Sequence, residues 1–167
     1  EDTLATDPQY ALRYIHDSLS PFDLGDRWCY VDYMGKHHGI GESQWKTICA
    51  STDLLLVLSG GCWTIRDHYR SIPCKAFIDS DPAFTQLAID QAARRADEKS
   101  QWYVDYFRAF DRLFTFGGNI GTAHSTVPTG EFNWIHTWQP VCMDLWAPAR
   151  SPLPRRELWT TVMTWKI

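Results

Sequence analysis

Polar and glycine-rich residues follow directly on three short apolar stretches of the chain. The clusters are Ser59-Gly60-Gly61, Asp79-Ser80-Asp81 and the five residues from Gly117 to Gly121. In open α/β sheets, ligands bind in the crevice beyond the carboxyl ends of the strands. We therefore expect the three clusters to share one ligand-binding rim. Each cluster taken alone also suits a tight turn, which needs Gly, Asp or Ser for local reasons.

The two carboxylates of the middle cluster offer several kinds of chemistry. Asp79 and Asp81, two residues apart, could hold a divalent cation through hard oxygen ligands. One of them could instead act as a base or accept hydrogen bonds from substrate hydroxyls. Asp81 precedes Pro82 and a helical segment, which is the arrangement of an N-cap and gives it a structural explanation. Asp79 has no such explanation, so we predict Asp79 as the catalytic residue.

The third cluster is not a dinucleotide fingerprint, because its glycines lack the G-x-G-x-x-G spacing. It does allow close approach of the backbone to a ligand, and Asn119 can both donate and accept hydrogen bonds. The chain also lacks a nucleophile elbow around Ser59, a P-loop and an H-E-x-x-H motif. His124 lies near the third cluster and is kept as a candidate. No cofactor or metal is predicted.

The elements that position these clusters alternate between strands and helices. Residues 54–58 form a continuous apolar run, typical of a strand buried on both faces of a parallel sheet. Further strands are predicted at residues 74–78 and 112–116, and helices at 64–71 and 83–110. Tyr103, Tyr106, Phe107 and Phe110 fall on one helical face and are predicted to pack in the core.

Other segments complete the predicted architecture. A helix is expected after Asp7-Pro8, a strand over 28–33, a short helix over 43–50 and a last strand over 159–165. The fold class is therefore α/β, with a mostly parallel, Rossmann-like sheet flanked by helices, in a single domain over residues 1–167.

The composition excludes several classes of protein. A net charge of -4 argues against a general nucleic-acid binder, and no apolar run approaches the roughly 20 residues that span a bilayer. The five cysteines lack a C-x-x-C pair and are predicted to be buried, reduced thiols of a cytoplasmic protein. Nine tryptophans must either build the core or line a surface that stacks on ligands.

Seven motifs occur along the chain in a fixed order. They are Asp7-Pro8-x-Tyr10, Asp26-Arg27-Trp28, Asp53-Leu-Leu-Leu-x-Leu-Ser59-Gly60, Asp79-Ser80-Asp81-Pro82-x-Phe84-Thr85-Gln86, Phe114-Thr-Phe-Gly117-x-Asn119-Ile-Gly121, Gln139-Pro140-Val141 and Thr160-Thr-Val-x-x-Trp165. Together they resemble a group of bacterial glycosyltransferase-like proteins of the two-domain GT-B type. The likeness covers nearly the whole chain, and residues 79–86 and 114–121 are its most specific parts.

The resemblance implies that this chain is the later part of an N-terminal, acceptor-side domain. Family members are longer at both ends, bind the nucleotide-sugar donor on a downstream domain and generally need no metal. A sheet lacking its upstream strands would expose an edge, which a homodimer could cover. The alternative is a non-enzymatic α/β protein that binds carbohydrate or a protein partner.

Combining the clusters with the resemblance gives one set of candidate substrate-contacting residues around Asp79. Trp63, just beyond the first cluster, is the indole best placed to meet a ligand, whereas most tryptophans near the C-terminus are assigned to packing. The full set is Ser59, Gly60, Gly61, Trp63, Ser80, Asp81, Phe84, Thr85, Gln86, Gly117, Gly118, Asn119, Gly121 and His124.

Overall fold

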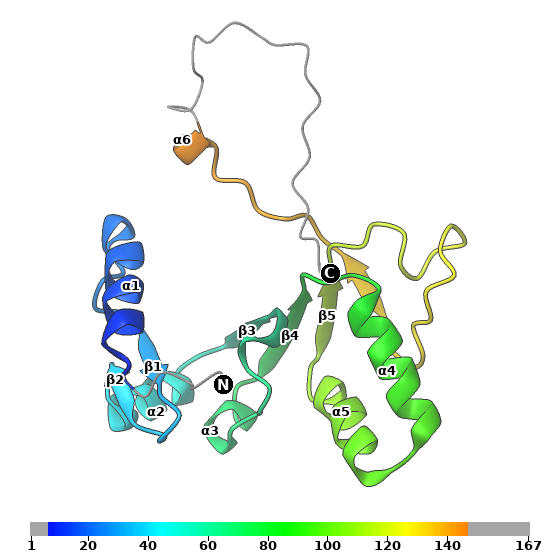
Figure 1. Ribbon diagram of the computed structural model, residues 1–167, viewed down its shortest axis with the longest axis horizontal. Helices are drawn as coiled ribbons and strands as arrows, with labels where there is room; N and C mark the ends of the chain where they lie inside the picture. Colours follow the sequence, from blue (N-terminus) through cyan, green and yellow to red (C-terminus); the bar gives the residue numbers. More distant parts are fainter. Residues whose placement is uncertain (1–6, 147–167) are drawn as a thin grey trace, which may run out of the picture.

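A computed structural model of the protein describes residues 7–146 (Figure 1). The elements follow in the order α1 (Gln9–Leu19), η1 (Ser20–Phe22), β1 (Cys29–Val31), β2 (His37–Gly39), α2 (Glu42–Ala50), β3 (Leu54–Leu58), η2 (Ser59–Gly61), α3 (Asp67–Arg70), β4 (Cys74–Asp79), α4 (Phe84–Arg95), α5 (Glu98–Arg108), β5 (Arg112–Thr115), β6 (Trp134–His136) and α6 (Met143–Trp146).

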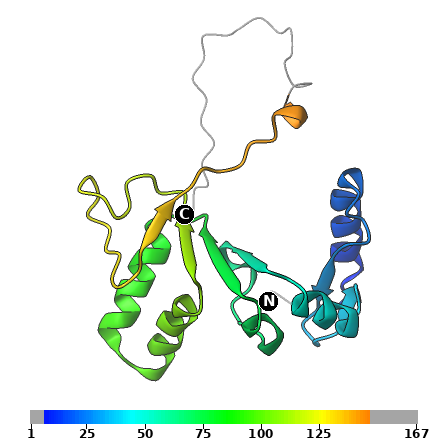
Figure 2. The same cartoon turned by 180° about the vertical axis from the view of Figure 1, so that it is seen from behind.

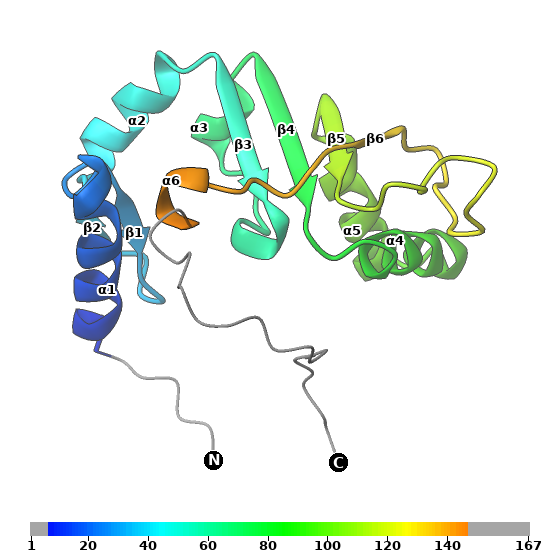
Figure 3. The ribbon, with the colours of Figure 1, turned by 90° about the horizontal axis from the view of Figure 1, so that it is seen from above.

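Strands β3, β4, β5 and β6 form one parallel sheet in that order, and β1 and β2 form a separate antiparallel pair. Helices α4 and α5 lie on one side of the molecule, and α1 with the β1–β2 pair lies beyond the β3 edge (Figures 1 and 2). After β6, the chain runs back across the sheet toward the β3 side, where α6 begins (Figure 3). The predicted α/β class with a parallel sheet flanked by helices is confirmed.

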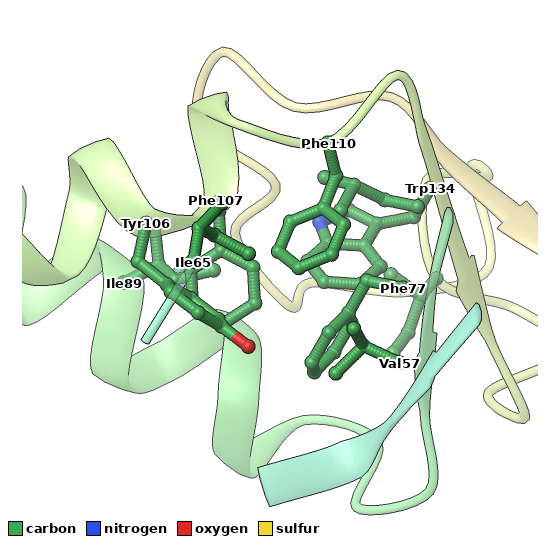
Figure 4. Packing of buried hydrophobic residues seen from close by; sticks show 10 residues of the cluster. Val57, Ile65, Phe77, Ile89, Tyr106, Phe107, Phe110 and Trp134 are labelled. Carbon is green, nitrogen blue, oxygen red and sulfur yellow. The ribbon is translucent and has the colours of Figure 1, made fainter. Parts of the chain in front are cut away.

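The core lies between this sheet and the helices (Figure 4). Register places Val57, Phe77, Leu113 and Trp134 in one row across all four strands, and each of them is buried. Phe107 of α5 is completely buried and meets Phe77 edge to face, with ring centroids 5.1 Å apart. The prediction that the aromatic residues on this helical face pack in the core is confirmed. Such aromatic pairs add about 0.5–1.5 kcal/mol to the burial of their area.

The opposite face of β3 is exposed. Leu54, Leu56 and Leu58 alternate with the inward-facing residues and are 47%, 57% and 61% exposed. Within residues 7–146, the prediction that this strand is buried on both faces is wrong. The reason is topological: β3 is an edge strand, and Ile65, Ile89 and Phe107 all pack on its other side.

Other boundaries differ from expectation in smaller ways. The single helix predicted for 83–110 is two helices, because Ala96 adopts a left-handed conformation and Asp97 caps α5 by accepting from Ser100 N at 2.8 Å. Strand β6 was not expected, and the strand expected over 159–165 lies outside the described residues.

All five cysteines are free thiols, as predicted. Only Cys49 is buried, however, and Cys142 is exposed, so the prediction of uniformly buried thiols is wrong. No helix among the described residues is long and apolar enough to cross a bilayer.

Candidate functional site

The first and second clusters meet beyond the carboxyl ends of β3 and β4, as the sequence predicted. The Ser59 hydroxyl donates to Asp81 Oδ2 at 3.1 Å, and the Ser80 hydroxyl donates to the same oxygen at 3.4 Å. Asp81 is exposed, so its carboxylate joins two loops that are 22 residues apart while facing solvent. We call Ser59, Ser80 and Asp81 the strand-end site.

Asp79 lies beneath this site and has no exposed surface. Its Oδ1 accepts from the Thr85 hydroxyl at 2.7 Å and from Asp81 N at 3.1 Å. Its Oδ2 accepts from Gln86 Nε2 and from the Thr115 hydroxyl, both at 2.9 Å. A carboxylate has about four lone-pair positions, and here four donors occupy them.

This geometry does not support the role of base that the sequence suggested for Asp79. A base must reach the proton it removes by a direct hydrogen bond or through one water. Asp79 instead ties the end of β4 to the start of α4 and to β5, so it positions the loop that carries Asp81.

The N-cap role expected for Asp81 is also wrong. The N-cap of α4 is Ala83, whose backbone N–H donates to Gln86 Oε1 at 2.7 Å. Gln86 therefore serves the helix start with its oxygen and Asp79 with its nitrogen. Since the cap is supplied in this way, the carboxylate of Asp81 is left available at the surface.

The loops of the site contain strained backbone. Ser59 has a φ of 49° and Ala83 a φ of 74°, in the left-handed region that residues with a Cβ rarely adopt. Such residues cost of order 1–3 kcal/mol each and cluster at functional sites. The strain falls on the two loops that the Ser59–Asp81 hydrogen bond joins.

The third cluster packs beside the second. A Cβ atom added at Gly117 would lie 2.5 Å from Ile120 and 2.9 Å from Pro82, so only glycine fits between them. Gly117 N donates to the Thr115 hydroxyl at 3.1 Å, which links this loop to the network of Asp79. Asn119 is exposed beyond it. Gly121 (φ 82°) and His124 lie farther along the β5–β6 connection, both exposed, and no described hydrogen bond joins them to Asp81.

Exposed aromatic side chains stand on the segments that follow the strands. Phe84, the first residue of α4, is 79% exposed. Trp138, two residues after β6, is 81% exposed, and its ring lies 4.5 Å from that of His136. Sequence reasoning missed His136 and assigned Trp138 to packing. The signal that could have found them was a strand ending at His136, which places both at the same rim.

Trp63 occupies a different position from the strand-end site. Its indole stacks on Tyr103 at 5.9 Å, on the side of the sheet that the helices cover. Burial, and secondarily the charge of Asp79, raise the pKa of the Tyr103 hydroxyl. A Cβ at Gly60 would lie 2.7 Å from the Trp63 ring, so the glycine allows the indole to pack against the first cluster.

Among the described residues, no group of three His, Cys, Asp or Glu side chains is arranged to hold a metal ion. The cation site considered for Asp79 and Asp81 lacks free oxygens on Asp79, since all its positions are occupied. Comparison of the chain with protein-family models, curated proteins and solved structures finds no match.

Proposed function

We propose that this chain is the acceptor-side part of a glycosyltransferase-like protein of GT-B type, in which the strand-end site binds a hydroxyl-bearing acceptor. The observation that supports the proposal is the exposed carboxylate of Asp81, held between the hydroxyls of Ser59 and Ser80. An anionic oxygen surrounded by hydroxyl groups suits a neutral polyol and disfavours a phosphate.

In this proposal, Asp81 is the base in place of Asp79. The acceptor hydroxyl transfers its proton to the Asp81 carboxylate while its oxygen forms a bond to the anomeric carbon of the donor sugar. The bond between that carbon and the nucleotide phosphate breaks, and the phosphate leaves with the electron pair. Ser59 orients the carboxylate through its hydrogen bond. The nucleotide would be bound by a further domain, as the family resemblance implies.

The test is turnover of nucleotide-sugars by the full-length protein, measured as release of the nucleoside diphosphate over a panel of hydroxyl acceptors. Asp81→Asn should lower kcat by about 100-fold or more, since a positioned base contributes roughly that factor. Asp17→Asn, an exposed carboxylate on α1, is the matched control and should retain full activity. Unchanged kcat in Asp81→Asn would exclude Asp81 as the base.

A second candidate is a carbohydrate-binding protein that performs no transfer. It is favoured by Phe84 and Trp138, whose exposed rings could stack on sugar faces without any catalytic group. Sugar binding by the wild-type protein with no nucleotide-sugar turnover under any donor would select this candidate over the first.

A further inference from the structure

A pocket of about 190 Å³ lies on the helix-covered side of the sheet, and its lining includes none of Ser59, Ser80 and Asp81. It opens between α5 and the segment that joins β3 to α3, and its lining includes Trp63, Arg70, Trp102, Asp105 and Tyr106. We infer that this pocket is a second carbohydrate subsite, which binds one pyranose ring of a neutral sugar. The inference rests on the proposed function only in assuming that the protein handles sugars.

Two indoles form the apolar walls of the pocket. Trp63 is 44% exposed and Trp102 is 52% exposed, so both rings remain available to a ligand. The buried ring of Tyr106 lies 5.6 Å from Trp63 and 6.2 Å from Trp102, and it supports both from beneath. Aromatic rings held in this way supply a large apolar area for the C–H face of a sugar at little entropic cost.

Tyr106 is itself fixed. Its hydroxyl donates to the carbonyl oxygen of Cys62, the residue before Trp63. Burial raises the pKa of Tyr106 well above its usual range, so the hydroxyl stays protonated and continues to donate. The pocket is therefore largely formed before a ligand arrives, as is usual for small-molecule sites.

Arg70 and Asp105 supply the polar groups. Asp105 Oδ1 accepts from Gln101 Nε2 at 2.9 Å and from Arg108 Nη1 at 2.6 Å. None of the described residues forms a hydrogen bond with Asp105 Oδ2. These hydrogen bonds, that of Gln101 first, lower the pKa of Asp105 and keep it an anionic acceptor. Arg70 makes one loose ion pair, to Asp67 at 3.4 Å.

The charges select the class of ligand. The charge of Asp105 is paired with that of Arg108 at 2.6 Å, and the charge of Arg70 with that of Asp67 at 3.4 Å, so the pocket offers no unpaired charge to an ionic ligand. A neutral hydroxyl can donate to Asp105 Oδ2 and accept from Arg70. The volume adds a second restriction, because sites for drug-sized ligands measure about 300–1,000 Å³. A pocket of about 190 Å³ suits one ring, with the rest of an oligosaccharide outside.

The experiment uses the full-length protein with ¹⁵N-labelled indoles, titrated with the methyl pyranosides of glucose, galactose and mannose. We expect the indole N–H signals of Trp63 and Trp102 to shift, with assignments from Trp63→Phe and Trp102→Phe. Trp102→Ala should weaken binding by roughly tenfold, since one stacking face is lost. Arg70→Gln should weaken it severalfold, and Trp28→Phe, the matched control at an indole that donates to Gly25 O at 2.6 Å outside this pocket, should leave it unchanged.

Each outcome decides the matter. Shifts confined to Trp138 would place sugar binding on the segment after β6 and overturn this subsite, while leaving the proposed function intact. No shift at any indole, or unchanged affinity in both Trp102→Ala and Arg70→Gln, would overturn the subsite. If Trp102→Ala does not fold, Arg70→Gln decides alone, because its side chain is exposed. The turnover assay on Asp81→Asn tests the proposed function separately.

Discussion

The two faces of the four-stranded sheet differ sharply although the same strands build both. One face carries the buried row from Val57 to Trp134 and ends in the hydrogen-bonded network of Asp79. On the other face, Leu54, Leu56 and Leu58 of β3 are about half exposed. Parallel sheets are usually covered on both faces. The main buried cluster of the described residues lies on the helix-covered face, so substitutions on the two faces of β3 should differ accordingly.

Phe107→Ala should produce the largest loss on the helix-covered face. Phe107 contacts Phe77, Tyr103, Tyr106, Phe132 and Trp134. Truncation leaves a cavity among these rings, and the free energy of unfolding should fall by about 3–5 kcal/mol. Chemical denaturation followed by far-UV circular dichroism measures this loss. Phe84→Ala, at an exposed ring, is the control and should change stability little; equal losses in the two variants would contradict the assignment of the core.

Asp79→Ala should give the next largest effect. The substitution leaves the donors of Thr85, Gln86 and Thr115 without their acceptor, and each unsatisfied buried group costs about 1–3 kcal/mol. We expect a net loss near 3 kcal/mol after partial rearrangement. Asp81→Asn should stay within about 0.5 kcal/mol, as is usual for exposed positions. The same denaturation experiment tests both, and comparable losses would mean that Asp81 is also structural.

The contrast between these aspartates marks where sequence reasoning stops. Strands β1, β3, β4 and β5 and most helices were predictable because apolar runs and turn residues are local signals. The meeting of Ser59 with Asp81 also followed from the parallel topology. The N-cap role predicted for Asp81 was wrong, however, because Ala83 is the N-cap of α4 although Asp81-Pro82 has the sequence pattern of one. The sequence around Asp79 also could not show its fourth donor, because Thr115 lies 36 positions away.

The sequence failed to predict strand β6 and the exposed face of β3 for the same reason. Three residues, Trp134 to His136, carry no periodic signal, and only pairing with β5 makes them a strand. Likewise, the run from Leu54 to Leu58 cannot indicate which of its faces is covered, because that depends on where the helices pack. Local composition thus predicts the elements, and long-range contacts assign their environment.

The capping of α5 should give a smaller effect with a defined pH dependence. The hydrogen bond from Ser100 N lowers the pKa of Asp97. Because the pKa in the folded state lies below that in the unfolded state, the stabilisation is complete above the ordinary value near 4 and disappears as the pH falls through the folded value. Asp97→Ala should therefore be less stable than the wild type at pH 7, by less than Asp79→Ala.

Thermal unfolding at pH 7 and at progressively lower pH measures this difference, which should shrink with acidification. Asp97→Asn is the matched control, because asparagine caps helices about as well and does not titrate in this range. A difference between wild type and Asp97→Ala that stays constant down to the lowest pH would show that the carboxylate charge plays no part.

The smallest change in the free energy of unfolding is expected on the exposed face of β3, and the control substitution is at the next residue. Leu56→Thr replaces a side chain that is 57% exposed, and it should change the free energy of unfolding by less than about 0.5 kcal/mol. Val57→Thr nearly preserves volume on the same strand, but it buries a hydroxyl in the core and should cost about 1–3 kcal/mol. Denaturation curves of the two variants compare the faces directly. A loss in Leu56→Thr as large as that in Val57→Thr would mean that the leucine face is also covered in solution.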